Sequence, residues 1–227
     1  MKRLVLCLAA LALATSLASC SKATPQPAPT VNMDVGVGTP PSEGWRWVVA
    51  EIVTGADEVK EAPNAGHDFF WIFYVLSGSN EVTMGDGTKL ASAGEGIMVP
   101  AKQQHSHRYP PQSKVLAFDV RSANENPSAF HRGTKVLLSD KVTLRPAADY
   151  KVRVRTYSID PGSQRDADTI QDPNFVHVIE GTLTTTVGKD VTRTEAGKAF
   201  SAPLNTKFVM KNEGTTKLRY VVADVHP

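Results

Sequence analysis

The feature that most limits the fold of this chain is an internal repeat at a constant spacing. The sequence YVLSG at 74–78 returns as HVIEG at 177–181, so Gly78 and Gly181 lie 103 residues apart. The same offset relates Gly85 to Gly188, Ala93 to Ala196, Gly94 to Gly197 and Pro100 to Pro203. Glycine and proline fix tight turns, so the same turns recur in the same order. We therefore predict two copies of one small domain within the 227 residues.

The repeated unit is predicted to be built from β-strands. Short runs rich in β-branched and aromatic residues are separated by turn signals, and the run at 151–157 alternates charged with apolar residues. That alternation is typical of a half-buried strand. The Gly-Asp-Gly sequence at 85–87 indicates a hairpin. Because no long segment has helical periodicity, we predict an all-β chain with only minor helix.

The strand and turn order resembles the cupin family. The residues that carry the resemblance are the YVLSG turn, the GEGIMVP segment at 94–100, and His105 five residues after Pro100. The resemblance implies two tandem β-barrels of the jelly-roll type over about residues 45–227. We place an N-terminal barrel at 45–135 and a degenerate C-terminal barrel at 136–227.

Metal-binding cupins carry two histidines, a glutamate and a later histidine at defined positions. In this chain the first position is Ala65 and the glutamate position is Trp71, whereas His67 and His105 match. His107 shares a strand face with His105, because residues i and i+2 point the same way. The resemblance implies His67 and His105 as ligands, and the shared strand face adds His107, so we predict a site on these three histidines for a divalent Fe, Zn, Ni, Cu or Mn ion. The alternative is that these histidines are hydrogen-bonded side chains without a metal.

The second copy lacks these imidazoles. The positions 103 residues beyond Ala65, His67, Trp71, His105 and His107 hold Asp168, Ile170, Asn174, Phe208 and Met210. The cupin fold thus does not require histidine at these places. The second barrel is predicted to be a packed structural partner without a metal.

Aromatic residues are expected to line the first barrel. Phe69, Trp71 and Phe73 alternate along one run, and Tyr109 lies beyond the histidines near the expected mouth. Trp71 stands where the resemblance places a ligand. It either fills the pocket or forms a flat wall for a ring-shaped ligand.

The N-terminus has the pattern of a lipoprotein leader. A basic start precedes an apolar stretch, and the sequence Leu-Ala-Ser-Cys at 17–20 resembles the bacterial lipobox. We predict a signal peptide at 1–19, lipidation of Cys20 and a flexible tether over 20–44. This places the protein in the cell envelope, at the periplasmic side of a membrane in a Gram-negative host, where Ser21 favours the outer membrane. The other cysteine, Cys7, lies in the leader, so no thiol remains for a disulfide or a nucleophile.

Charge and missing motifs exclude several function classes. The chain has 25 Lys and Arg against 23 Asp and Glu, and removing Lys2 and Arg3 with the leader makes them equal. A nucleic-acid partner is therefore not expected. There is no phosphate-binding loop, dinucleotide-binding fingerprint or nucleophile elbow.

Two functions remain open. The first is an enzyme acting on a small molecule in the N-terminal barrel through a metal, for which the resemblance allows dioxygenase or isomerase chemistry. The second is a non-catalytic, membrane-anchored module that binds a ligand or a protein. The resemblance also allows a homodimer.

Overall fold

The computed structural model describes residues 26–38, 44–66, 68–85, 87–124, 133–143, 149–166 and 169–227. Every regular element in these ranges is a β-strand, which confirms the all-β prediction. None of the described segments forms a helix long and apolar enough to cross a membrane. The predicted leader, Cys20 and His67 lie outside the described residues.

Eighteen strands follow one another along the described chain. In the first half they are β1 (Thr30–Gly38), β2 (Trp45–Val53), β3 (Val59–Lys60), β4 (Trp71–Ser77), β5 (Ser79–Met84), β6 (Gly87–Ser92), β7 (Gly96–Val99), β8 (His105–Tyr109) and β9 (Lys114–Ser122). In the second half they are β10 (Thr134–Leu138), β11 (Tyr150–Ile159), β12 (Gln164–Asp166), β13 (Asn174–Glu180), β14 (Thr182–Val187), β15 (Asp190–Glu195), β16 (Ala199–Phe200), β17 (Val209–Asn212) and β18 (Leu218–His226).

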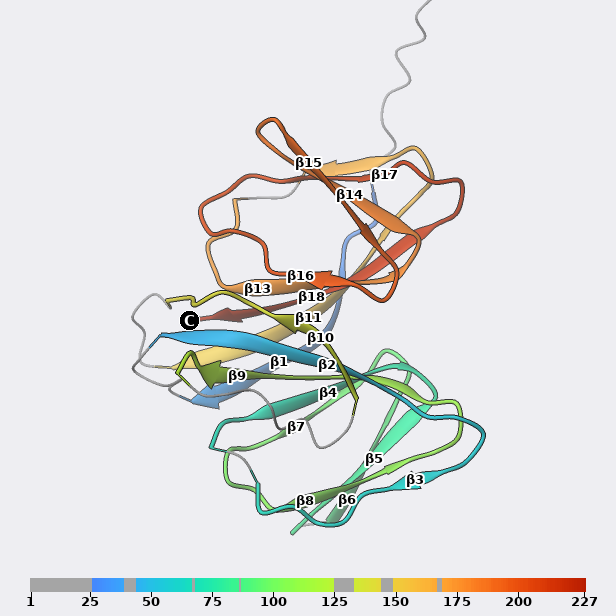
Figure 1. Cartoon of the computed structure of the whole chain (residues 1–227), viewed down its shortest axis with the longest axis vertical. Helices are drawn as coiled ribbons and strands as arrows, with labels where there is room; N and C mark the ends of the chain where they lie inside the picture. The colour runs from blue at the N-terminus through green and yellow to red at the C-terminus, as the bar shows by residue number, and fades with distance from the viewer. Residues whose placement is uncertain are drawn as a thin grey trace, which may run out of the picture.

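These strands form four antiparallel sheets that make two barrels (Figure 1). The first barrel combines the sheet β10-β2-β9-β4-β7 with the sheet β3-β8-β5-β6. The second combines β1-β11-β18-β13-β16 with β12-β17-β14-β15. The repeated turn glycines Gly78 and Gly181 have φ of 72° and 81°, a conformation that favours glycine. The prediction of two cupin barrels is confirmed.

One strand of each half pairs with the other half. Strand β1 pairs with β11 of the second barrel, and β10 pairs with β2 of the first. The structure therefore corrects the expected tether over 20–44, because Thr30–Gly38 is a strand. Its apolar residues alternate, and Met33 is buried against the core. Strand β10 spans the expected division between residues 135 and 136.

A shared apolar core lies between the two barrels. The sheets containing β2 and β11 place one face each against the other, and large aromatic side chains meet there edge to face. The ring centroid of Phe175 lies 5.2 Å from that of Trp47 and 5.0 Å from that of Phe118. Because residues alternate along a strand, the opposite faces of these sheets point into the barrels. Those inward faces carry the candidate sites.

Candidate functional site

Two of the three predicted metal ligands lie inside the first barrel. His105 and His107 alternate on β8, and both are buried. Their ring centroids are 5.0 Å apart, and the rings are perpendicular. The structure thus brings these two imidazoles together on the interior face, as the i, i+2 spacing predicts.

Both imidazoles are held by hydrogen bonds. His105 Nδ1 lies 2.9 Å from the Gln103 carbonyl oxygen, and its Nε2 lies 3.2 Å from Asn64 Nδ2. His107 Nδ1 lies 3.3 Å from Asn80 Oδ1. A neutral His105 satisfies both of its contacts if Nδ1 donates to the carbonyl and Nε2 accepts from the amide. Burial lowers the pKa of His105, which favours this neutral form.

Aromatic side chains fill the rest of this interior. Trp71 and Phe73 stack with centroids 5.7 Å apart, and Phe73 lies 4.1 Å from the His107 ring. Tyr109 stacks on His107 with ring centroids 5.3 Å apart. Trp71 is therefore a packed core residue. Phe69 precedes β4, is only half-buried, and does not belong to the buried cluster.

The described residues alone do not make a metal centre. No three His, Cys, Asp or Glu side chains among them converge closely enough to hold an ion. His67 is outside the described ranges, so the predicted site on His67, His105 and His107 stays a prediction. The His105 Nε2 lone pair would become available to a metal only if the Asn64 amide moved away.

The strand registers show which interior positions of the two barrels correspond. In each barrel, three strands contribute one inward residue to each row across the sheet. The three rows of the first barrel are Val48-Asp119-Trp71, Ala50-Ala117-Phe73 and Ile52-Val115-Val75. The three rows of the second barrel are Arg153-Asp224-Asn174, Arg155-Val222-Val176 and Tyr157-Tyr220-Val178.

The substitutions in these rows leave the second barrel hollow. Asn174 and Val176 take the places of Trp71 and Phe73, which removes two large rings from the first two rows, whereas Tyr157 and Tyr220 replace Ile52 and Val115 in the third row. A cavity of about 560 Å³ lies there. The structure therefore corrects the expectation that the second barrel is a packed partner without a pocket, whereas the predicted pocket of the first barrel stays a prediction.

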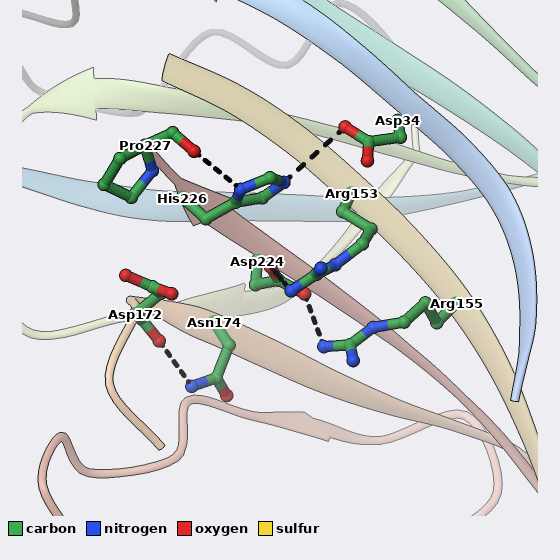
Figure 2. Close-up of polar contacts among 8 residues, drawn as sticks. All are labelled: Asp34, Arg153, Arg155, Asp172, Asn174, Asp224, His226 and Pro227. Atoms are coloured by element: carbon green, nitrogen blue, oxygen red, sulfur yellow. Dashed lines mark hydrogen bonds and ion pairs between the residues drawn. The ribbon is translucent and has the colours of Figure 1, made fainter. Parts of the chain in front are cut away.

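One wall of the cavity is an ion-paired group of three side chains (Figure 2). Arg153 Nη2 donates to Asp224 Oδ1 at 2.9 Å, and Arg155 Nη2 donates to Asp224 Oδ2 at 2.6 Å. Asp224 is buried, whereas about a quarter of the Arg155 side chain is exposed. The sequence shows the alternation of Arg153 and Arg155, but it does not show that the charged face of this strand points into a barrel.

Part of the cavity lining is aromatic. Tyr157 and Tyr220 lie parallel, with centroids 5.0 Å apart. The guanidinium carbons of Arg155 and Arg165 lie 5.7 and 5.0 Å from the centre of the Tyr157 ring. Burial raises the pKa of both tyrosines, so both phenols are neutral near neutral pH. The remaining apolar lining comes from Pro29, Ile170, Val176, Met210 and Val222.

Comparisons with known proteins identify the fold. No protein-family model and no curated protein matches the chain. Among solved structures, AerE from Microcystis aeruginosa aligns at 15% identity with a TM-score of 0.56, over 89% of this chain and 99% of that one. A mutant of oxalate decarboxylase from Bacillus subtilis aligns at 11% identity with a TM-score of 0.58, over 88% and 78% of the two chains. Another structure of that enzyme is described by its Mn(II) centres.

These likenesses establish a cupin fold in two copies. They cover both barrels, because the alignments span nearly nine tenths of the chain. At such low identities they show the fold alone. The chemistry has to be inferred from the side chains that this chain places in its barrels.

Proposed function

We propose that this protein binds a small molecule inside its second barrel. The observation that carries the proposal is the 560 Å³ cavity, which combines an apolar lining with a group of arginine side chains. Small-molecule sites in proteins have roughly this size, about 300–1,000 Å³, and place a few polar groups in an apolar wall.

The first barrel supports this assignment as an internal comparison. It has the same fold but carries Val48 and Ala50 where the second barrel has Arg153 and Arg155. The barrel architecture therefore does not need arginine at these two positions, although the first barrel also pairs Arg121 with Asp119, the counterpart of Asp224. Burying charged groups costs free energy, so we attribute their presence in the second barrel to a ligand.

The experiment fills the second-barrel cavity with the side chains that occupy the corresponding positions of the first barrel. The double variant Asn174→Trp/Val176→Phe places the first barrel's two aromatic residues in the cavity. Purified native protein should carry or retain a small molecule from a host-cell extract, detected by native mass spectrometry, and the double variant should not. Val191→Ala, at an exposed position of β15, is the matched control and should behave as wild type. Equal profiles for wild type and the double variant would contradict the proposal.

A second candidate function is a metal centre in the first barrel. It is favoured by the convergence of His105 and His107 and would include His67 as third ligand. A divalent ion there would supply Lewis-acid or oxygen-activating chemistry of the dioxygenase or isomerase kind. The Mn(II) centres of the similar oxalate decarboxylase are consistent with this candidate.

Elemental analysis tests the metal directly. Protein without an affinity tag, reloaded with Mn, Fe, Zn, Ni or Cu, should hold close to one ion per chain, and both His67→Ala and His105→Ala should lose it. His226→Ala, which removes a histidine at the end of the last strand, is the control and should keep the ion. If the reloaded protein holds no ion, the metal centre is ruled out and the non-catalytic alternative remains.

We further propose that the protein is anchored in the cell envelope through lipid on Cys20. The leader and the Leu-Ala-Ser-Cys sequence support this. Labelled palmitate should be incorporated into the wild type and not into Cys20→Ala, and the variant should leave the membrane fraction. Equal labelling of the two would contradict the anchor.

A further inference from the structure

Several polar groups of the second-barrel cavity are hydrogen-bond donors that are not fully used. A guanidinium has five N–H donors, and Asp224 accepts one bond from each of Arg153 and Arg155. The buried Nε atoms of both arginines and the hydroxyl of Tyr220 have no partner among the described residues. A ligand that satisfies this wall must therefore supply acceptors.

The charge of the inner wall is positive. Two guanidiniums share the single carboxylate of Asp224. Arg165 adds another positive charge; its Nη1 donates to the Pro27 carbonyl oxygen at 3.1 Å, and no carboxylate within the described ranges pairs with it. Asp166 and Asp172 also line the cavity, but Asp166 is exposed and Asp172 is half-exposed. Asp172 and Arg165 are exposed to a similar degree, whereas the charge of the exposed Asp166 is screened by water more strongly than those of Arg155 and Asp224.

The apolar part of the cavity restricts the body of the ligand. Ile170, Val176 and Met210 offer no hydrogen bonds, and the Tyr157–Tyr220 stack presents an aromatic surface. A small, fully hydrated anion such as phosphate would leave this lining wet. An anion with an apolar body would cover it and release water.

We propose that the cavity takes a small organic acid, whose carboxylate accepts hydrogen bonds from Arg155 and Arg165 while its apolar body packs on Ile170, Val176 and Met210. This rests on the small-molecule function proposed above and specifies its ligand class. Carboxylate–guanidinium pairs are short and strong, and they are geometrically selective when both oxygens engage.

The test uses acids paired with neutral amides of the same shape. Benzoate, hexanoate and 3-phenylpropionate are titrated into the protein by calorimetry beside benzamide, hexanamide and 3-phenylpropionamide. At least one acid should bind, and its amide should bind at least about tenfold more weakly, as expected when a charge-assisted hydrogen bond is lost. Inorganic phosphate, which lacks the apolar body, should bind more weakly than that acid.

Variants test whether Arg155 and Arg165 contribute to the binding of the acid. Arg155→Met and Arg165→Met keep an unbranched apolar stem and remove the guanidinium, so each should weaken binding of the acid by about tenfold and leave binding of the amide unchanged. Arg193→Met, on the outer strand β15, is the control and should bind as wild type. Arg155→Met leaves Arg153 paired one to one with Asp224. If that variant fails to fold, Arg155→Gln keeps an amide donor toward Asp224 without the charge, and it should show the same loss.

The possible results distinguish a wrong ligand class from a wrong proposed function. Equal binding of acid and amide, binding of phosphate as tight as that of the best acid, or binding by no acid in the panel would overturn the organic-acid proposal. If the native protein still carries a neutral compound that Asn174→Trp/Val176→Phe loses, the cavity function stands and only the ligand class is wrong.

Discussion

At the scale of single residues, His177 shows how the shared core constrains a polar group. It lies on the outward face of β13, where the first barrel buries it completely, and neither ring nitrogen forms a hydrogen bond with a described residue. Its Nε2 is 3.8 Å from Glu51 Oε1, and Lys114 pairs with the same oxygen at 2.8 Å. Burial, together with the charge of Lys114, lowers the pKa of His177 to about 4.

Stability is therefore expected to fall as the solution is acidified. Between its ordinary pKa of 6.5 and the lowered value of about 4, the unfolded chain takes up a proton on His177 that the folded chain does not. The folded state is thus favoured above about pH 6.5 and loses stability as the pH falls. From about pH 7.5 to about pH 5, His177→Phe should lose about 2 kcal/mol less free energy of unfolding than wild type, measured by urea titration. The same loss in wild type and His177→Phe would contradict the assignment, and His226→Gln serves as control.

The residue scale also shows what sequence can and cannot predict. The i, i+2 spacing of His105 and His107 was sufficient to place both on one face, because strand periodicity is local. Arg153 and Arg155 have the same spacing, which alone indicates a solvent-facing side. Their inward direction depends on Phe175, Val221 and the rest of the inter-barrel core covering the opposite face, and that packing is long-range.

At the scale of elements, strand β1 links the segment after the predicted anchor to the second barrel. It pairs with β11 from Thr30–Thr156 to Gly38–Tyr150, beside the strand that carries the cavity arginines. The Asn32 side chain accepts a bond from Thr156 Oγ1, which also contacts the Tyr74 hydroxyl of the first barrel. The Pro, Ala and Thr content of residues 21–44 predicted a tether, but the alternating apolar residues of β1 are those of a strand.

Removing β1 should destabilise the second barrel. A chain that begins at residue 39 lacks the buried Met33 and exposes the edge of β11. A chain that begins at residue 26 keeps Met33 and the pairing of β1 with that edge. Burial of one such side chain contributes about 1.5–3 kcal/mol, and in a chain of this size each kcal/mol shifts the melting temperature by about 2–4 °C. Calorimetry should show a melting temperature at least about 3 °C lower for the shorter chain. Equal melting temperatures for the two truncations would show that β1 contributes no stability.

At the scale of the whole molecule, the shared core predicts that the barrels unfold together. Phe175 is fully buried and contacts Trp47 and Phe118 across the interface. Phe175→Ala should cost about 3–5 kcal/mol through the cavity it leaves. Differential scanning calorimetry should show one transition that moves to lower temperature as a unit, with Val191→Ala unchanged. A second transition that keeps the wild-type temperature would mean that the barrels are independent.

The repeat makes the overall architecture predictable, because its turn glycines and prolines recur at one spacing in both copies. It does not predict which copy is hollow. That difference depends on a few side chains across three interior rows, in which Trp71 and Phe73 fill one barrel while Asn174 and Val176 leave space in the other. Reading those rows requires the strand register, which only the structure supplies.

A crystal structure of the mature chain, soaked with the tightest acid of the panel, is the most direct test of where this protein binds its ligand. We expect density for the acid in the second barrel, in contact with the guanidiniums of Arg155 and Arg165, and a first barrel filled by Trp71 and Phe73. Density for the acid beside His105 and His107, or a second barrel closed by its own side chains, would contradict the account.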